Sequence, residues 1–219
     1  MNDIIQALAV YALPVIFAIT LHEAAHAFAA KYFGDNTAYA AGRMSLNPLR
    51  HIDPFGTILL PALMYAFTPF VFGYAKPVPI DFSRLRNPKK QMAWVALAGP
   101  AANFVMAFGW TLLLLLMTAL GMSEPYFFKV AQAGVIVNII MFVFNLVPIP
   151  PLDGGRIMTS LLPARYAYQF AKIEPYGFFI VLALLYLKLL NYWVVPIATV
   201  TQWLLALLAS PFKFLFNLF

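Results

Sequence analysis

Residues 4–33 read IIQALAVYALPVIFAITLHEAAHAFAAKYF, and this stretch decides the class of fold. A helix needs about 20 mainly apolar residues to cross the hydrocarbon core of a bilayer, and the stretch exceeds that length. Its charged and imidazole side chains, which are His22, Glu23, His26 and Lys31, all lie in its second half. The stretch therefore predicts a membrane-spanning helix with its polar groups near one end.

The composition of the whole chain agrees with this prediction. Of its 219 residues, 63% are hydrophobic and 10% are charged, whereas about half of a soluble domain is apolar and about a quarter is charged. Further apolar runs cover residues 92–122, 127–147, 176–190 and 193–209, and a run broken by prolines covers residues 55–75. We therefore expect an all-α polytopic membrane protein with about five transmembrane helices, plus a re-entrant hairpin or short strands after the first helix.

The charge pattern predicts an orientation. The chain carries 14 Lys and Arg against 8 Asp and Glu, but it has no basic stripe interleaved with aromatic residues, so nucleic acid is not an expected partner. In membrane proteins, basic loops collect on the cytoplasmic side. If residues 55–75 enter and leave on the same face, every Lys and Arg except Lys129 and Lys188 lies on one side. This predicts an outside N-terminus and places the histidine end of the first helix near the cytoplasm.

The motif His22-Glu23-Ala24-Ala25-His26 lies inside the first apolar run. Histidines four residues apart project from the same helix face, so both imidazoles can bind one cation. A catalytic zinc takes three protein ligands and a water, and a neighbouring glutamate can remove a proton from that water. Because ionisable groups inside a membrane are costly, their presence here favours a functional metal site. The chain has no cysteine, which excludes thiolate ligands.

A third ligand has to come from the other histidine or from an acidic side chain. The candidates are Asp3, Asp35, His51, Asp53, Asp81, Glu124, Asp153 and Glu174. Asp153 is favoured because it follows the run 127–147 through a proline-rich exit, which can turn its carboxylate back toward the helices. The predicted topology also places Asp153 on the same side as His22. We therefore expect one Zn²⁺ per chain.

Three segments together resemble the site-2 protease family of intramembrane zinc metalloproteases, in its compact subgroup without PDZ or CBS domains. The segments are the motif at 22–26, Gly99-Pro100-Ala101-Ala102-Asn103, and residues 145–155, which read NLVPIPPLDGG. Their order and spacing agree with the family across roughly residues 18–155. The resemblance implies that His22, His26 and Asp153 bind zinc and that Glu23 is the general base.

The resemblance also implies an activity and its location. The expected reaction is hydrolysis of peptide bonds within or near a transmembrane helix of a substrate protein, in the cell membrane of a prokaryote. The catalytic core would consist of three helices, formed by the runs 4–33, 92–122 and 127–147. We expect residues 1–172 to form the protease unit and residues 173–219 to form a C-terminal transmembrane hairpin.

Two asparagines and one further histidine are weaker candidates. Asn145 is expected in catalysis and substrate binding, because an amide there can polarise a scissile carbonyl. Asn103 is a second candidate for substrate binding, although an intramembrane amide can instead form a hydrogen bond between helices. His51 is a spare ligand, an auxiliary acid or a residue of a capping loop.

Two alternative functions fit some of the same residues. A membrane zinc transporter would also need intramembrane ionisable groups and broken helices. A non-catalytic protein that binds transmembrane helices would keep the fold without the chemistry. Glu23 discriminates between these functions, because a general base is not a metal ligand and its loss spares metal binding. A transport path would need several sets of metal ligands along it, and the sequence indicates one such set.

Overall fold

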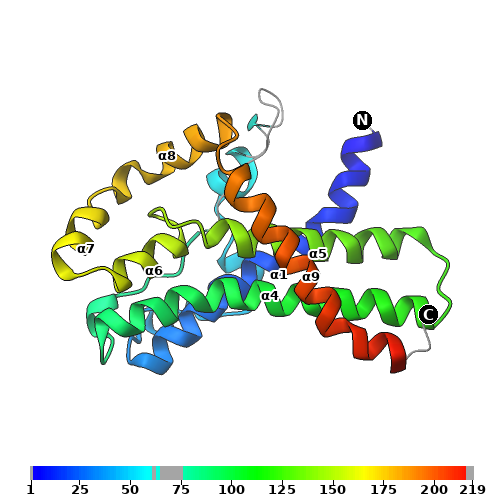
Figure 1. Cartoon of the computed structure of the whole chain (residues 1–219), viewed down its shortest axis with the longest axis horizontal. Helices are drawn as coiled ribbons and strands as arrows, with labels where there is room; N and C mark the ends of the chain where they lie inside the picture. The colour runs from blue at the N-terminus through cyan, green and yellow to red at the C-terminus, as the bar shows by residue number, and fades with distance from the viewer. Residues whose placement is uncertain (1, 61–62, 65–75, 216–219) are drawn as a thin grey trace.

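The computed structural model describes residues 2–60, 63–64 and 76–215, and all regular structure within those ranges is helical (Figure 1). No strand occurs among the described residues, so the expected short strands are absent from residues 36–60. The elements are α1 (Asn2–Phe33), α2 (Thr37–Ala40), η1 (Pro48–Arg50), η2 (Pro54–Leu59), η3 (Phe82–Arg84), α4 (Pro88–Ala119), α5 (Pro125–Asn145), α6 (Asp153–Leu161), α7 (Ala164–Ala171), α8 (Glu174–Tyr186) and α9 (Asn191–Leu215).

Four helices in the described part of the chain, α1, α4, α5 and α9, are long and apolar enough to cross a membrane. The chain is therefore an integral membrane protein. Helix α8 has 13 residues, and at 1.5 Å per residue it covers about 20 Å of a core about 30 Å thick. The predicted hairpin of two C-terminal spanning helices is thus replaced by one short helix and one spanning helix.

Helix α4 lies at the centre of the packing and contacts α1, α5, α6 and α9. It runs antiparallel to α5, and α9 crosses both of them (Figure 1). Ala107, Ile139, Val143 and Leu205, which come from α4, α5 and α9, form a buried apolar cluster. This packing holds α4 and α5 in a fixed register. It therefore fixes the position of the loop that leaves α5.

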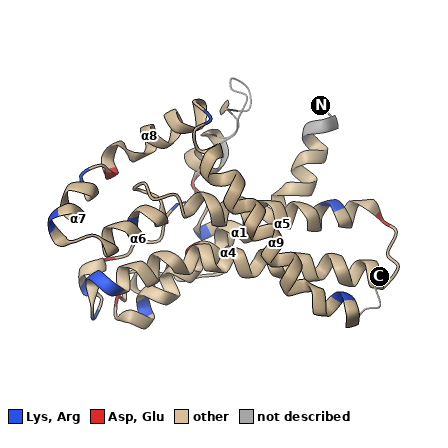
Figure 2. Cartoon of the chain, viewed as in Figure 1, with Lys and Arg blue, Asp and Glu red and all other residues tan. Residues whose placement is uncertain are grey.

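The direction of α9 corrects one part of the charge argument. Leu190 packs near Val147, at the exit of α5, while the ring of Phe212 lies 6.1 Å from that of Phe108 in the second half of α4. Lys213 therefore lies toward the end where α4 finishes, and Lys188 lies toward the opposite end. This arrangement differs from the charge argument, which placed Lys213 at the end where α4 begins and Lys188 at the end where α4 finishes. Most of the other basic residues gather at the end that carries α6 and α7 (Figure 2).

The connection between α1 and α4 is only partly described. Its first part contains α2, η1 and η2, and its last part contains an extended stretch at residues 76–81 followed by η3. Residues 61–62 and 65–75 lie outside the described residues, and most of the predicted re-entrant hairpin at 55–75 falls on them. The hairpin therefore stays a prediction.

Two short amphipathic helices follow the loop after α5, and Pro163 separates them. Helix α6 ends at Leu161 and α7 begins at Ala164, with Pro163 between them. Proline has no backbone N–H and fixes φ, so it ends one helix and begins the next. The resulting arc of short helices lies beside the metal-ligand loop rather than across the membrane.

Candidate metal centre

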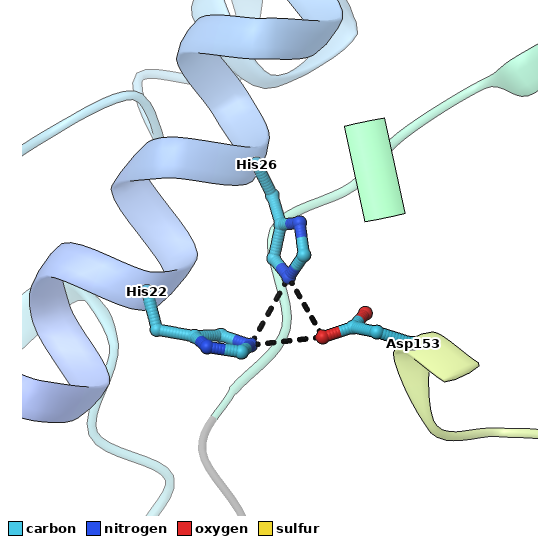
Figure 3. A group of neighbouring side chains, drawn as sticks. All are labelled: His22, His26 and Asp153. Carbon is cyan, nitrogen blue, oxygen red and sulfur yellow. Dashed lines mark hydrogen bonds and ion pairs between the residues drawn. The ribbon is translucent and has the colours of Figure 1, made fainter. Parts of the chain in front are cut away.

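His22, His26 and Asp153 converge on one point between α1 and the start of α6 (Figure 3). The two histidine Nε2 atoms lie 3.0 Å apart. Asp153 Oδ2 lies 3.2 Å from His22 Nε2 and 3.3 Å from His26 Nε2. All three residues are more than nine-tenths buried. The structure thus brings together the three predicted metal ligands, which are separated by up to 131 positions in the chain.

The helical period and a folded loop explain this convergence. His22 and His26 are one turn apart on α1, so they share a face. Asp153 reaches them because the loop after α5 folds back closely upon itself. A Cβ at Gly154 would lie 2.4 Å from the carbonyl oxygens of Leu146 and Val147, and one at Gly155 would lie 2.3 Å from the nitrogen of Pro150. The two glycines therefore allow the close turn that aims Asp153 at α1.

Hydrogen bonds to α4 fix the orientation of both imidazole rings. His22 Nδ1 lies 2.6 Å from Asn103 Oδ1, and His26 Nδ1 lies 2.8 Å from the carbonyl oxygen of Val95. A carbonyl oxygen accepts only, so Nδ1–H of His26 donates, and the amide oxygen of Asn103 sets the same role for His22. The Nε2 lone pairs of both rings are then free for a metal.

Gly99 makes room for the rings on α4. A Cβ at this position would lie 2.3 Å from His26 Nε2 and 2.7 Å from His22 Cε1. Real Cβ atoms do not come that close to other atoms, so only glycine lets α4 pack directly against the two histidines at this point. Gly99 and Asn103 are one helical turn apart, and they thus act on the same pair of rings.

The residues present fit a zinc ion. Tetrahedral ligands about 2.0–2.1 Å from zinc lie about 3.3–3.4 Å from one another, which is close to the distances among these three atoms. Asp153 Oδ2 is buried and has no well-directed hydrogen bond. Burial raises the pKa of Asp153, but the facing His26 and His22 outweigh this effect and hold it well below its usual range. A zinc ligand of this kind has to be a carboxylate.

Glu23 lies beside the ligands and contacts the extended stretch 76–81. Its Oε2 accepts a hydrogen bond of 2.8 Å from the backbone N–H of Val78. Val78 in turn packs against Ala27 and Ala38. Glu23 is only partly buried, unlike the two histidines that flank it. Among the described residues, the carboxylate of Glu23 accepts this one hydrogen bond through Oε2.

The two predicted substrate-binding asparagines lie in different surroundings. Asn103 is fully buried, and its Nδ2 donates to the carbonyl oxygen of Ala18 and to Asn138 Oδ1. Asn145 is partly buried, and its Nδ2 donates to the carbonyl oxygen of Met141 one turn earlier. Their roles toward a substrate stay predictions.

His51 is fully buried but is not part of the metal centre. Its Nε2 lies 2.8 Å from the carbonyl oxygen of Ser45, and its own backbone carbonyl accepts from Lys76 N–H. These contacts join the loop after α1 to the extended stretch. Of the three roles considered for His51, these contacts favour that of a residue in a capping loop.

Sequence reasoning missed Asn138, which is fully buried in α5. Its Nδ2 donates to the carbonyl oxygen of Gly134, and its Oδ1 accepts from Asn103. A chain of amides therefore leads from α5 through α4 to His22. An uncharged amide in the middle of the apolar run 127–147 was the signal that could have identified it.

Comparisons with known proteins agree with this geometry. A family model described as Peptidase family M50 matches residues 121–188. The chain is 38% identical over 185 residues to "Putative zinc metalloprotease YwhC" of Bacillus subtilis, which covers 82% of this chain and 81% of that protein. It is 33% identical over 183 residues to "Putative zinc metalloprotease Rip2" of Mycolicibacterium smegmatis, covering 81% of this chain and 67% of the relative. No solved structure gives a significant match.

The site and these relatives together define the class of protein. Three side chains of the kind that binds zinc lie together among apolar helices. The chain is also similar over most of its length to proteins named as zinc metalloproteases. The chain belongs to peptidase family M50, the site-2 protease family. Its expected cofactor is Zn²⁺, which His22, His26 and Asp153 are placed to bind.

Proposed function

We propose that the chain is an intramembrane endopeptidase that hydrolyses peptide bonds within or near a transmembrane helix of another protein. The observation that carries this proposal is the ligand trio. Two of its members, His22 and His26, flank Glu23 on the second half of the apolar helix α1. His22, His26 and Asp153 would hold zinc, which when bound supplies a Lewis acid that acidifies water and polarises a carbonyl.

The side chains of the protein supply the rest of the chemistry. Glu23 is placed to take a proton from the attacking water and to return it to the leaving amine. Asn103 and the Val95 carbonyl keep the imidazoles in the tautomer that leaves Nε2 free. The partly buried Asn145, at the end of α5, is our candidate for polarising the scissile carbonyl.

The depth of the site supports a substrate inside the membrane. Gly99 is eleven positions after the first residue of α4, which places the histidines about 16 Å along that helix. The basic residues gather at the same end of the molecule. We therefore propose that cleavage takes place below the cytoplasmic membrane surface, on a substrate segment that has lost its helical hydrogen bonds locally.

The proposal is tested with purified protein in liposomes that contain a tagged single-span protein with Gly and Asn in its span. Glu23→Gln should retain about one zinc per chain and lower the cleavage rate by about 10²–10⁴-fold. His22→Ala, His26→Ala and Asp153→Asn should each lose zinc as well as cleavage. Metal analysis and gel quantification of the products measure both effects. Unchanged cleavage by Glu23→Gln would disprove the assignment.

The same liposomes distinguish a protease from a zinc transporter. A zinc-sensitive dye trapped inside them should report no zinc entry above that of protein-free liposomes. In the described part of the chain, the trio is the single group of its kind, which does not favour a path of successive sites. Zinc entry that depends on His22 would favour the transporter.

A further inference from the structure

An open surface cavity of about 400 Å³, lined by exposed and half-buried residues, lies outside the metal centre, in the connection between α1 and α4. Its volume is in the range of small-ligand sites. The lining residues are Ala41, Gly42, Arg43, Leu49, Arg50, Ile52 and Lys76. Three of them are cationic and none is acidic, so the cavity attracts an anion.

These three cations have no acidic partner among the residues that the structure describes. The ion pairs found there involve His22, His26 and Asp153, or join Arg84 to Asp81 and Arg156 to Glu174. The acid closest in sequence, Asp53, instead accepts hydrogen bonds from the backbone at the start of η2. The positive charge of the cavity is therefore not neutralised within the described protein.

Backbone carbonyls hold the two guanidinium groups in place. Arg43 Nη2 donates to the carbonyl oxygen of Lys76 at 3.0 Å, and Arg50 Nη1 donates to that of Gly42. Arg43 Nε is buried and has no hydrogen-bond partner among the described residues. A guanidinium has five N–H donors, so both groups have donors left for a ligand. A ligand that accepts from the buried Arg43 Nε would also remove the cost of leaving that donor unpaired.

We propose that this cavity binds the phosphate group of an anionic phospholipid. Phosphate oxygens match the paired donors of guanidinium groups. Leu49, which is 75% exposed, and Ile52 provide apolar surface for the carbon atoms next to the phosphate. Basic pockets of membrane proteins are recognised lipid headgroup sites. A lipid headgroup therefore fits both the charge and the apolar rim.

The cavity is connected to Glu23. Arg43 donates to the carbonyl of Lys76, and two residues later Val78 N–H donates to Glu23 Oε2. A phosphate bound to Arg43 and Lys76 thus holds the segment that contacts Glu23. This link to activity rests on the proposed protease function, whereas phosphate binding does not.

The test counts lipids bound to the full chain in phosphatidylcholine nanodiscs that contain about one-tenth phosphatidylglycerol, by mass spectrometry of the intact complex. The wild type should carry more phosphatidylglycerol than the surrounding bilayer predicts. The double variant Arg43→Gln/Arg50→Gln should lose this enrichment by about tenfold or more. The matched control Lys89→Gln/Lys90→Gln removes two exposed charges at the start of α4 and should keep it.

A second arm titrates inorganic phosphate into pure phosphatidylcholine nanodiscs. Saturable phosphate binding without phosphatidylglycerol enrichment would assign the cavity to free phosphate and overturn the lipid proposal. Equal enrichment in the wild type and in both double variants would also overturn it. Zinc content and the size-exclusion profile report whether the variants fold. If the double variant Arg43→Gln/Arg50→Gln does not fold, the single variant Lys76→Gln gives the same test.

Discussion

At the residue scale, Gly99 sets how closely α4 approaches the zinc ligands. We expect Gly99→Ala to displace both imidazoles, because its Cβ would lie 2.3 Å from His26 Nε2, and overpacking of this kind costs about 1–3 kcal/mol. Zinc content after dialysis should fall well below that of the wild type. The control is Gly109→Ala on the same helix, where nothing lies within 4 Å of the added methyl. A normal zinc content in Gly99→Ala would contradict this account.

Variants of Asn103 and Asn145 distinguish two roles, which are the orientation of a metal ligand and contact with the substrate. Asn103→Leu should weaken zinc binding about 10–100-fold, the usual effect of losing the partner that orients a histidine ligand. Asn145→Leu should keep the zinc affinity of the wild type and lower the cleavage rate, because Asn145 makes its described hydrogen bond to Met141. Zinc titrations with a competing chelator measure the first effect. If the two variants bound zinc equally, the positioning role of Asn103 would be wrong.

The sequence was sufficient for the three ligands and insufficient for the residues that support them. His22 and His26 follow from helical spacing, and Asp153 from an acid placed after a proline-rich exit. Gly99 belonged to a quoted motif, but its closeness to the histidines depends on how α4 packs against α1. Asn138 contacts Asn103 only because α5 has a particular rotation about its axis. Neither packing nor rotation is encoded in local spacing.

At the element scale, Asp35 ties the end of α1 to the extended stretch that contacts Glu23. Asp35 is fully buried. Its Oδ1 accepts from Thr37 and its Oδ2 from the backbone N–H of Asp81. Because α1 ends at Phe33 and the extended stretch begins more than 40 positions later, this one carboxylate joins two distant segments.

We expect Asp35→Ala to lower the unfolding free energy by about 1–3 kcal/mol, since it leaves buried donors unpaired. Cleavage should fall while zinc content stays normal, because the three ligands lie on α1 and α6. Thermal unfolding in detergent and metal analysis measure the two effects. Asp81→Ala removes the carboxylate that caps η3 and pairs with Arg84 but keeps the N–H donor to Asp35, so it should cost less stability than Asp35→Ala. Loss of zinc in Asp35→Ala would show that Asp35 supports the metal centre itself.

The lengths of the elements show where composition misleads. Residues 176–190 are apolar, and hydropathy alone predicts a spanning helix there. Helix α8 ends at Tyr186, and Lys188 adopts a left-handed conformation with φ of 57°. Beyond this turn the chain continues along α5 as α9, toward the end where α4 finishes. Composition alone did not indicate the break between α8 and α9.

At the scale of the whole molecule, the direction of α9 predicts which residues share a membrane face. Single cysteines at Arg86 and Arg165 should react with an impermeant thiol reagent only from the cytoplasmic side. Cysteines at Ser123 and Ser210 should react only from the outside. The wild type has no cysteine, so it provides a clean background. Reaction of position 210 from the cytoplasmic side would mean that α9 does not cross, and reaction of position 86 from outside would mean that residues 55–75 do.

The orientation predicted from the charge distribution stays a prediction, and it does not depend on the positions of the two lysines. Lys188 and Lys213 exchange sides, so the excess of basic residues on the proposed cytoplasmic side is unchanged. The rule that places basic loops on that side depends on totals over short loops rather than on single residues. The charge rule is therefore insensitive to where α8 lies, whereas the expected number of spanning helices depends on it directly.

The fold of the loop after α5 has a consequence for biosynthesis. Two of the candidate ligands lie on α1 and the third follows α5, so a zinc ion held by all three would link an earlier part of the nascent chain to a later one. A chain that has not yet been translated past Asp153 carries Glu23 and both histidines but lacks the complete ligand set. On the proposed function, a nascent chain at this stage of synthesis is therefore inactive, because its metal site is incomplete.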